Sequence, residues 1–128
     1  MSIEKYRKLV NLLWRRTQER ALSWRWDTAT KSVTCWIGKR PLTIAASQNN
    51  DYEDLYIFTI YNEKSEAVER FNDELIGGEL INVDGFETYF GLCEALFSIA
   101  QKQATGADIA LDEMLDNLEK NEIDDDPF

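Results

Sequence analysis

The segment Leu55-Tyr-Ile-Phe-Thr-Ile-Tyr61 decides the fold, because its β-branched and aromatic residues predict the strongest strand of the chain. The polar residues 62–66 that follow are typical of a hairpin turn, and residues 68–71 are expected to return as a shorter edge strand. Residues 47–54, which precede the segment, are polar and predict a loop. The centre of the sequence is therefore an antiparallel hairpin.

Three more strands are predicted before this hairpin. Residues 22–26, 33–37 and 42–46 each show the period-2 alternation that separates the two faces of a strand. Polar and turn-forming residues separate them at positions 27–30 and 38–41. The three segments predict a meander, which together with the hairpin gives an antiparallel sheet of about five strands.

Two helices are predicted on either side of the sheet segments. Residues 2–20 have an apolar stripe at helical spacing, formed by Ile3, Tyr6, Val10 and Leu13. Asp84 followed by Glu87 has the pattern of an N-cap with a capping-box partner, and predicts a largely apolar helix that ends at Thr105 and Gly106. We expect this helix to pack across the sheet.

A last helix is predicted over residues 107–119, and its apolar side chains share one face: Leu111, Met114, Leu115 and Leu118. Residues 72–84 are compatible with a loop or with a strand extension. The expected fold class is α+β, with an N-terminal helix, an antiparallel sheet of about five strands, and two C-terminal helices packed on one face of the sheet.

The length of 128 residues, with 44% hydrophobic residues, fits one α+β domain over residues 1–120. Residues 121–128 are acidic and contain a proline, so we expect a disordered tail. The net charge of −10 is unevenly distributed. Residues 1–40 carry ten basic and three acidic side chains, net +7, and residues 41–128 carry net −17.

The chain contains no histidine, which excludes Ser-His-Asp and Cys-His catalysis and His-ligated zinc. Acidic clusters at residues 51–54 and 124–126 lack the glycine and the spacing of a calcium-binding loop. Gly77-Gly78 lacks the Lys and Ser/Thr of a phosphate-binding loop. We therefore expect a protein that is not an enzyme and that has no catalytic residue, no metal site and no cofactor.

Two cysteines, Cys35 and Cys93, lie in apolar surroundings without the spacing of a redox or metal motif. Reduced, buried thiols of this kind favour a cytoplasmic protein. The start of the chain lacks the apolar core of a secretory signal, and no apolar run approaches the roughly 20 residues that cross a bilayer. We expect no membrane association.

Trp36 suggests an interaction surface. If Val33, Cys35 and Ile37 face the core, Trp36 points to the opposite side of the sheet. Outward-facing aromatic and apolar residues of the long strand would then join it in an apolar patch typical of partner or self-association surfaces. The candidate interaction surface is formed by Trp36, Tyr56, Phe58 and Ile60. The alternative is that a helix or loop covers this face.

A second candidate surface lies in the basic first third of the chain, which holds all four tryptophans. Aromatic rings interleaved with basic groups can bind single-stranded nucleic acid. The candidate contacts are Arg15, Arg16, Arg25, Trp24 and Trp26. The alternation of Trp24 and Trp26 is also that of core residues, and the strongly acidic remainder of the chain would repel a polyanion. We therefore regard nucleic acid as the less favoured partner.

The run Thr17-Gln-Glu-Arg-Ala-Leu-Ser-Trp24 resembles the T-x-x-G-x-L-x-W junction of small bacterial and phage-type α+β proteins with no assigned activity. The segment from Leu96 to Gly106, followed by Asp108 and an amphipathic helix, is similar to their closing segment. The resemblance covers about a third of the chain and implies a helix, an antiparallel meander and C-terminal helices. Arg20 stands where that pattern has glycine.

Together these observations favour a small acidic, cytoplasmic, non-enzymatic protein–protein interaction module, such as an adaptor, a chaperone-like protein or an inhibitor. Its expected partner is another protein or a second copy of the chain in a homodimer. The alternative function is single-stranded nucleic-acid binding through the basic, tryptophan-rich first third.

Overall fold

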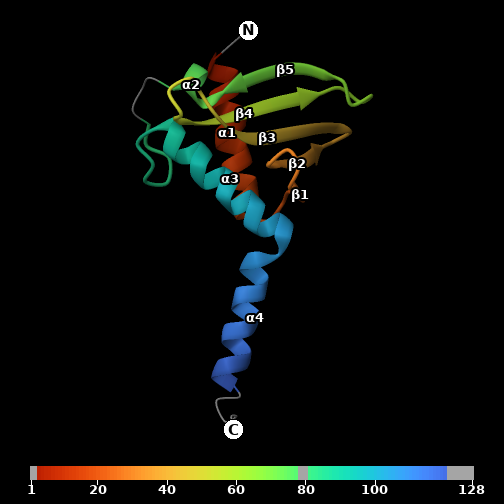
Figure 1. Cartoon of the computed structure of the whole chain (residues 1–128), viewed down its shortest axis with the longest axis vertical. Helices are drawn as coiled ribbons and strands as arrows, with labels where there is room; N and C mark the ends of the chain where they lie inside the picture. Colours follow the sequence, from red (N-terminus) through yellow and green to blue (C-terminus); the bar gives the residue numbers. More distant parts are fainter. Residues whose placement is uncertain (1–2, 78–80, 121–128) are drawn as a thin grey trace.

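The computed structural model describes residues 3–77 and 81–120. Five strands form one antiparallel sheet in the order β1-β2-β3-β4-β5, and helices flank it (Figure 1). In chain order the elements are α1 (Ile3–Gln18), β1 (Arg25–Asp27), β2 (Ser32–Ile37), β3 (Arg40–Gln48), β4 (Asp54–Tyr61), β5 (Ala67–Asn72), α2 (Asp73–Ile76), α3 (Tyr89–Thr105) and α4 (Ala107–Lys120). The predicted α+β fold and its order of elements are confirmed.

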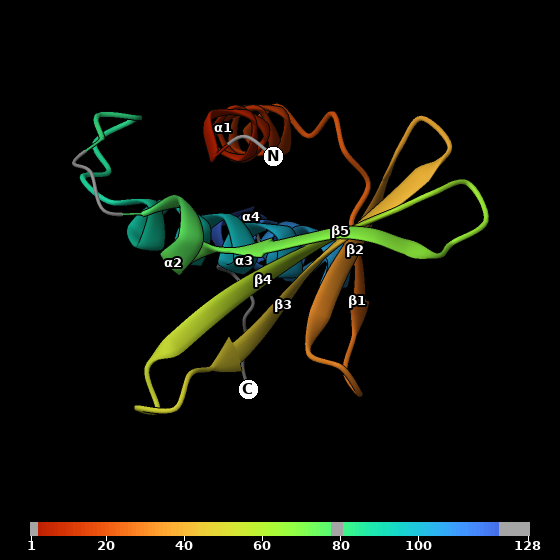
Figure 2. The ribbon, with the colours of Figure 1, turned by 90° about the horizontal axis from the view of Figure 1, so that it is seen from above.

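Helices α1 and α3 cover the same face of the sheet, as Figure 2 shows. The covered face carries fully buried side chains from the three central strands, including Val33, Ile44 and Phe58. Phe71 of β5 stacks between Phe58, at 4.8 Å between ring centroids, and Tyr6 of α1, at 4.2 Å. The core therefore lies between two helices and one sheet face.

The end of α1 has the hydrogen bonds of a Schellman motif. The Ala21 amide donates to the Arg16 carbonyl at 2.9 Å, and the Arg20 amide donates to the Thr17 carbonyl at 3.0 Å. Arg20 consequently has a left-handed backbone, with φ of 57°. Glycine adopts this conformation without the steric cost that Arg20 bears here.

Two predicted boundaries are wrong. The N-cap of α3 is Thr88, whose hydroxyl accepts a hydrogen bond from the Gly91 amide at 3.1 Å, and not Asp84. The Asp84 carboxylate instead accepts a hydrogen bond from the Trp14 indole at 2.8 Å. The first strand, β1, is also shorter than predicted. By contrast, the predicted end of α3 is confirmed, because Gly106 forms a left-handed cap with φ of 75°.

Residues 72–77 and 81–84, in the stretch that was compatible with a loop or a strand, include the short helix α2. The Asn72 side chain caps α2 by accepting from the Leu75 amide at 2.8 Å. At the other end, the Arg7 guanidinium of α1 donates to the carbonyls of Ile76 and Gly77. The predicted disordered tail at 121–128 lies outside the described residues.

Helix α4 departs from the expectation that both C-terminal helices pack on the sheet. It follows α3 after Gly106 and projects away from the sheet and from the other helices (Figure 1). None of its residues is buried. The sheet is covered by α1 and α3, and α4 forms an arm that extends from this body.

Candidate functional site

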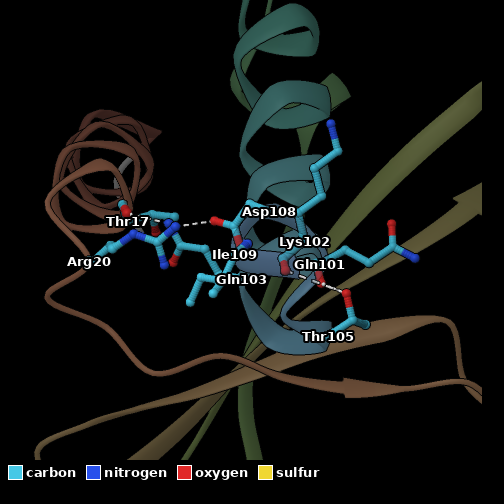
Figure 3. Close-up of polar contacts among 8 residues, drawn as sticks. All are labelled: Thr17, Arg20, Gln101, Lys102, Gln103, Thr105, Asp108 and Ile109. Carbon is cyan, nitrogen blue, oxygen red and sulfur yellow. Dashed lines mark hydrogen bonds and ion pairs between the residues drawn. The ribbon is translucent and has the colours of Figure 1, made fainter. Parts of the chain in front are cut away.

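The arm begins at a polar junction between α1, α3 and α4, shown in Figure 3. The Arg20 guanidinium donates to the Asp108 carboxylate at the start of α4. The Gln103 side-chain amide of α3 donates to the Thr17 carbonyl at 2.8 Å. The Thr17 hydroxyl accepts from the buried Trp24 indole at 3.1 Å. The Arg20–Asp108 pair thus joins the base of α4 to the end of α1, and the other two bonds join α3 and Trp24 to Thr17 of α1.

The rest of α4 presents an apolar stripe to solvent. Four side chains at positions i, i+3, i+4 and i+7 form this arm stripe, and they are Leu111, Met114, Leu115 and Leu118, exposed by 58%, 64%, 48% and 69%. Stripes with this spacing normally face a core or a partner helix groove. The stripe is the clearest unpartnered apolar feature of the described residues.

Acidic side chains cover the remainder of α4. The helix carries five carboxylates, Asp108, Asp112, Glu113, Asp116 and Glu119, against one basic group, Lys120. Lys120 pairs with Asp116 at 3.1 Å, and both side chains are largely exposed. The net charge of the arm is therefore −4.

The second candidate surface is the sheet face opposite α1 and α3, which we call the outer sheet face. The strand register places one row of side chains straight across it, in the order Arg25, Thr34, Thr43, Thr59 and Arg70. The three central residues of this row are threonines, and each edge strand contributes an arginine. Among the described elements no helix covers this face (Figure 2).

Trp36 lies on the outer sheet face, as its alternation with Val33 and Cys35 suggested. Its ring is 47% exposed, and the Arg25 guanidinium lies 5.2 Å from the ring centroid. At the other edge of the sheet, the Arg70 guanidinium donates to the Thr59 hydroxyl at 3.4 Å. Both edge arginines therefore lie along the face, one over an aromatic ring and one beside the threonine row.

The placement of Tyr56, Phe58 and Ile60 beside Trp36 is wrong. These three residues pair with Ala46, Ile44 and Leu42, which lie on the face that α1 and α3 cover. Tyr56 and Phe58 are buried, and Ile60 packs against the core. The residues of β4 and β5 that share the outer sheet face are instead Ile57, Thr59, Tyr61 and Arg70.

The five residues suggested for nucleic-acid contact do not form one surface. Trp24 is buried with its indole bonded to Thr17, and Trp26 faces the core beside Phe97, at 6.0 Å between centroids. Arg15 and Arg16 are exposed on the surface of α1, whereas Arg25 lies on the outer sheet face. The two rings offered for base stacking are therefore directed into the protein.

The buried titratable groups fit a structural role. Cys35 and Cys93 are buried, unpaired thiols. Burial raises the pKa of Cys35 to about 12 and also raises the pKa of Cys93, so both thiols stay protonated near neutral pH. Within residues 3–77 and 81–120, no group of three or more acidic or cysteine side chains is arranged to hold a metal ion.

No helix in the described part of the chain combines the length and the apolar character that crossing a membrane requires. Comparison with protein-family models, with curated proteins and with solved structures finds no match for this chain. The arm stripe and the outer sheet face are therefore the two features on which a functional proposal can rest.

Proposed function

We propose that this protein is a non-enzymatic protein–protein interaction module that binds its partner through the arm stripe of α4. The single observation that carries the proposal is a helix with four consecutive stripe positions exposed by about half or more. Burying one leucine side chain gains about 2 kcal/mol. A stripe of four such side chains therefore lacks this stabilisation as long as no partner covers it.

The mode of binding is an amphipathic helix laid on an apolar surface. The carboxylates around the stripe select partners with basic residues at the rim, and they disfavour nucleic acid and anionic membranes. The two buried, unpaired cysteines support a reducing compartment such as the cytoplasm. Within this class, an adaptor that presents α4 as its docking element fits these features best.

Site-specific photo-crosslinking in the source cell tests the proposal. A photoreactive phenylalanine analogue at position 118 lies in the stripe, and the same analogue at position 116, on the acidic side of α4, is the matched control. We expect a covalent protein adduct from position 118 and much less from position 116. Equal labelling at both positions, or no protein adduct at either, would contradict the proposal.

A further inference from the structure

We propose that the partner of the arm is a second copy of this chain, with the α4 stripe of each copy docked on the outer sheet face of the other. The inference rests on the proposed function and names the occupant of the stripe. It joins the two uncovered surfaces of the molecule in one symmetric dimer, in which each copy contributes an arm and receives one.

The arm is not placed to reach the sheet of its own chain. Its base is held by the Arg20–Asp108 ion pair and by the nearby Gln103–Thr17 hydrogen bond. From this junction α4 extends away from the sheet (Figure 1). One face of the sheet is already covered by α1 and α3 (Figure 2). Because α4 points away from the other face of its own sheet, the sheet that receives the stripe in this proposal belongs to another molecule.

The two surfaces match in shape and charge. The centre of the outer sheet face carries small side chains, with Thr34 and Thr43 partly exposed and Thr59 buried with the Arg70 guanidinium bonded to its hydroxyl. Larger apolar side chains border this region, namely Trp36, Ile57 and Tyr61. The arginines of the two edge strands meet an arm of net charge −4. The register also places the carboxylate of Asp27 on this face, so the charged strand residues of the outer sheet face are two arginines and one aspartate, and their net charge is opposite in sign to that of the arm.

The dimensions also agree. The 14 residues of α4 span about 21 Å at 1.5 Å per residue. Five strands spaced about 4.8 Å apart give a sheet about 19 Å wide between its edge strands. One helix of this length can reach across the outer sheet face from one edge strand to the other, which would give each copy a sheet with helices on both faces.

Buried area distinguishes this arrangement from a simple pairing of two arms. At about 100 Å² per stripe side chain, one arm on a sheet removes about 800 Å² from water, counting the arm surface and an equal area of the sheet that it covers. Two reciprocal contacts remove about 1,600 Å², the size of a stable interface. Two α4 helices packed stripe to stripe would remove only about 800 Å² in total. They would also bring two helices of net charge −4 together.

Analytical ultracentrifugation of the full chain and of two variants tests the inference. The arm variant is Met114→Glu with Leu118→Glu, and the sheet variant is Trp36→Glu. All three positions are exposed within one copy, so the body should fold in each variant, as circular dichroism would verify. We expect the wild type at twice its mass of 14.9 kDa, and each variant at the mass of one chain.

Matched controls change neighbouring apolar residues outside the proposed contacts. Ile109→Glu lies on α4 away from the stripe, and Ile37→Glu is the strand neighbour of Trp36 on the opposite face; both residues are exposed to about the same degree as Trp36. Both controls should remain dimeric. Loss of the dimer in either control to the same extent as in the variants would overturn the inference.

Mixing the arm variant with the sheet variant gives the decisive result. The sheet variant has an intact arm and the arm variant has an intact outer sheet face, so the mixture regains one of the two contacts. We expect a heterodimer that is weaker than the wild-type dimer. A sheet variant that dimerises alone would indicate arm-to-arm pairing, and an arm variant that dimerises alone would indicate sheet-to-sheet pairing. Either result overturns the inference.

A monomeric wild type would also overturn it, and the crosslinking experiment then separates the two proposals. If position 118 still forms adducts with a different protein, the interaction module stands and the second copy is excluded as its partner. If position 118 forms adducts neither with another protein nor with a second copy, the proposed function fails as well.

Discussion

Helices α3 and α4 are separated by a single residue, Gly106, and both have apolar faces, yet their surroundings are opposite. Helix α3 buries Leu92, Cys93, Leu96 and Ala100 against the sheet and α1, whereas α4 buries no residue. Helices α1 and α3 cover one face of the sheet, whereas α4 begins after Gly106 at the end of α3 and extends away from that face (Figure 1).

The described residues therefore divide into a body, residues 3–77 and 81–105, and an arm, α4. Apolar residues in the body stabilise the fold of one chain, and apolar residues in the arm are available for contact with another. Substitutions of equal chemical size should therefore have very different effects on unfolding in the two regions. The following predictions test that division.

The largest effect is expected for Phe58→Ala in the centre of the body. Phe58 is fully buried and stacks on Phe71. Removing a buried aromatic ring costs about 3–5 kcal/mol, which urea unfolding would measure. The matched control is Ile57→Ala on the outer sheet face, where the half-buried side chain should cost clearly less. Equal losses at the two positions would contradict the assignment of the two faces of β4.

The faces of β4 also show what the sequence can predict. The strand itself follows from its composition, but both of its faces are apolar, so alternation alone does not identify the buried one. The pairing with β3 identifies the buried face, because Phe58 lies opposite Ile44, which is fully buried. The face of Trp36 does follow from the sequence, because Trp36 alternates with Val33 and Cys35, which are both strongly apolar.

The errors at Asp84 and in the packing of α4 have a common cause. Asp84 and Glu87 have a local capping pattern, but the Trp14 indole, 70 residues away in sequence, takes the Asp84 carboxylate as its acceptor. Likewise, the spacing of Leu111 and Leu118 predicts a helix with one apolar face without saying which molecule covers it. Local patterns identified the elements, and contacts distant in sequence decided their partners.

A smaller effect is expected for Thr17→Val at the junction of body and arm. Valine has a similar shape and no hydroxyl, so the buried Trp24 indole loses its acceptor. An unsatisfied buried donor costs about 1–3 kcal/mol. Thr17→Ser keeps the hydroxyl and should retain most of the stability in the same unfolding measurement. If the valine variant were as stable as the serine variant, the hydrogen bond would contribute nothing to the junction.

Arg20→Gly should loosen the start of the arm without destabilising the body. Glycine removes the left-handed strain at φ of 57°, a gain of about 1 kcal/mol, and loses an exposed ion pair worth less than about 1 kcal/mol. We expect a body that is equally or more stable, and faster hydrogen exchange in the first turn of α4. Asp108→Asn loses the pair but keeps the strain, so it should be slightly destabilised. A large loss of stability in Arg20→Gly would show that the pair supports the body itself.

Asp73→Asn should change the pH dependence of the body. The buried Asp73 carboxylate accepts a hydrogen bond from the Tyr56 amide at 2.7 Å, and burial raises its pKa above the usual 3.8. Because the folded chain holds this proton more tightly, the free energy of unfolding falls as pH rises from the usual value through the raised one. Asparagine keeps the acceptor oxygen without the charge. The variant should therefore gain stability relative to wild type as pH rises through that interval. A difference that is flat with pH, or that falls, would contradict the prediction.

The smallest effect is expected for Leu118→Ala in the arm, measured in the Trp36→Glu background so that docking between copies makes no contribution. Leucine to alanine in a core costs about 2–5 kcal/mol, whereas an exposed site changes stability by about 0.5 kcal/mol or less. Leu118 is 69% exposed within one copy, so the free energy of unfolding should stay nearly constant. In the proposed dimer this side chain is buried between copies, so the same substitution in the wild-type background should weaken self-association. A core-sized loss in the monomeric background would place the stripe against its own body, and the division between body and arm would fail.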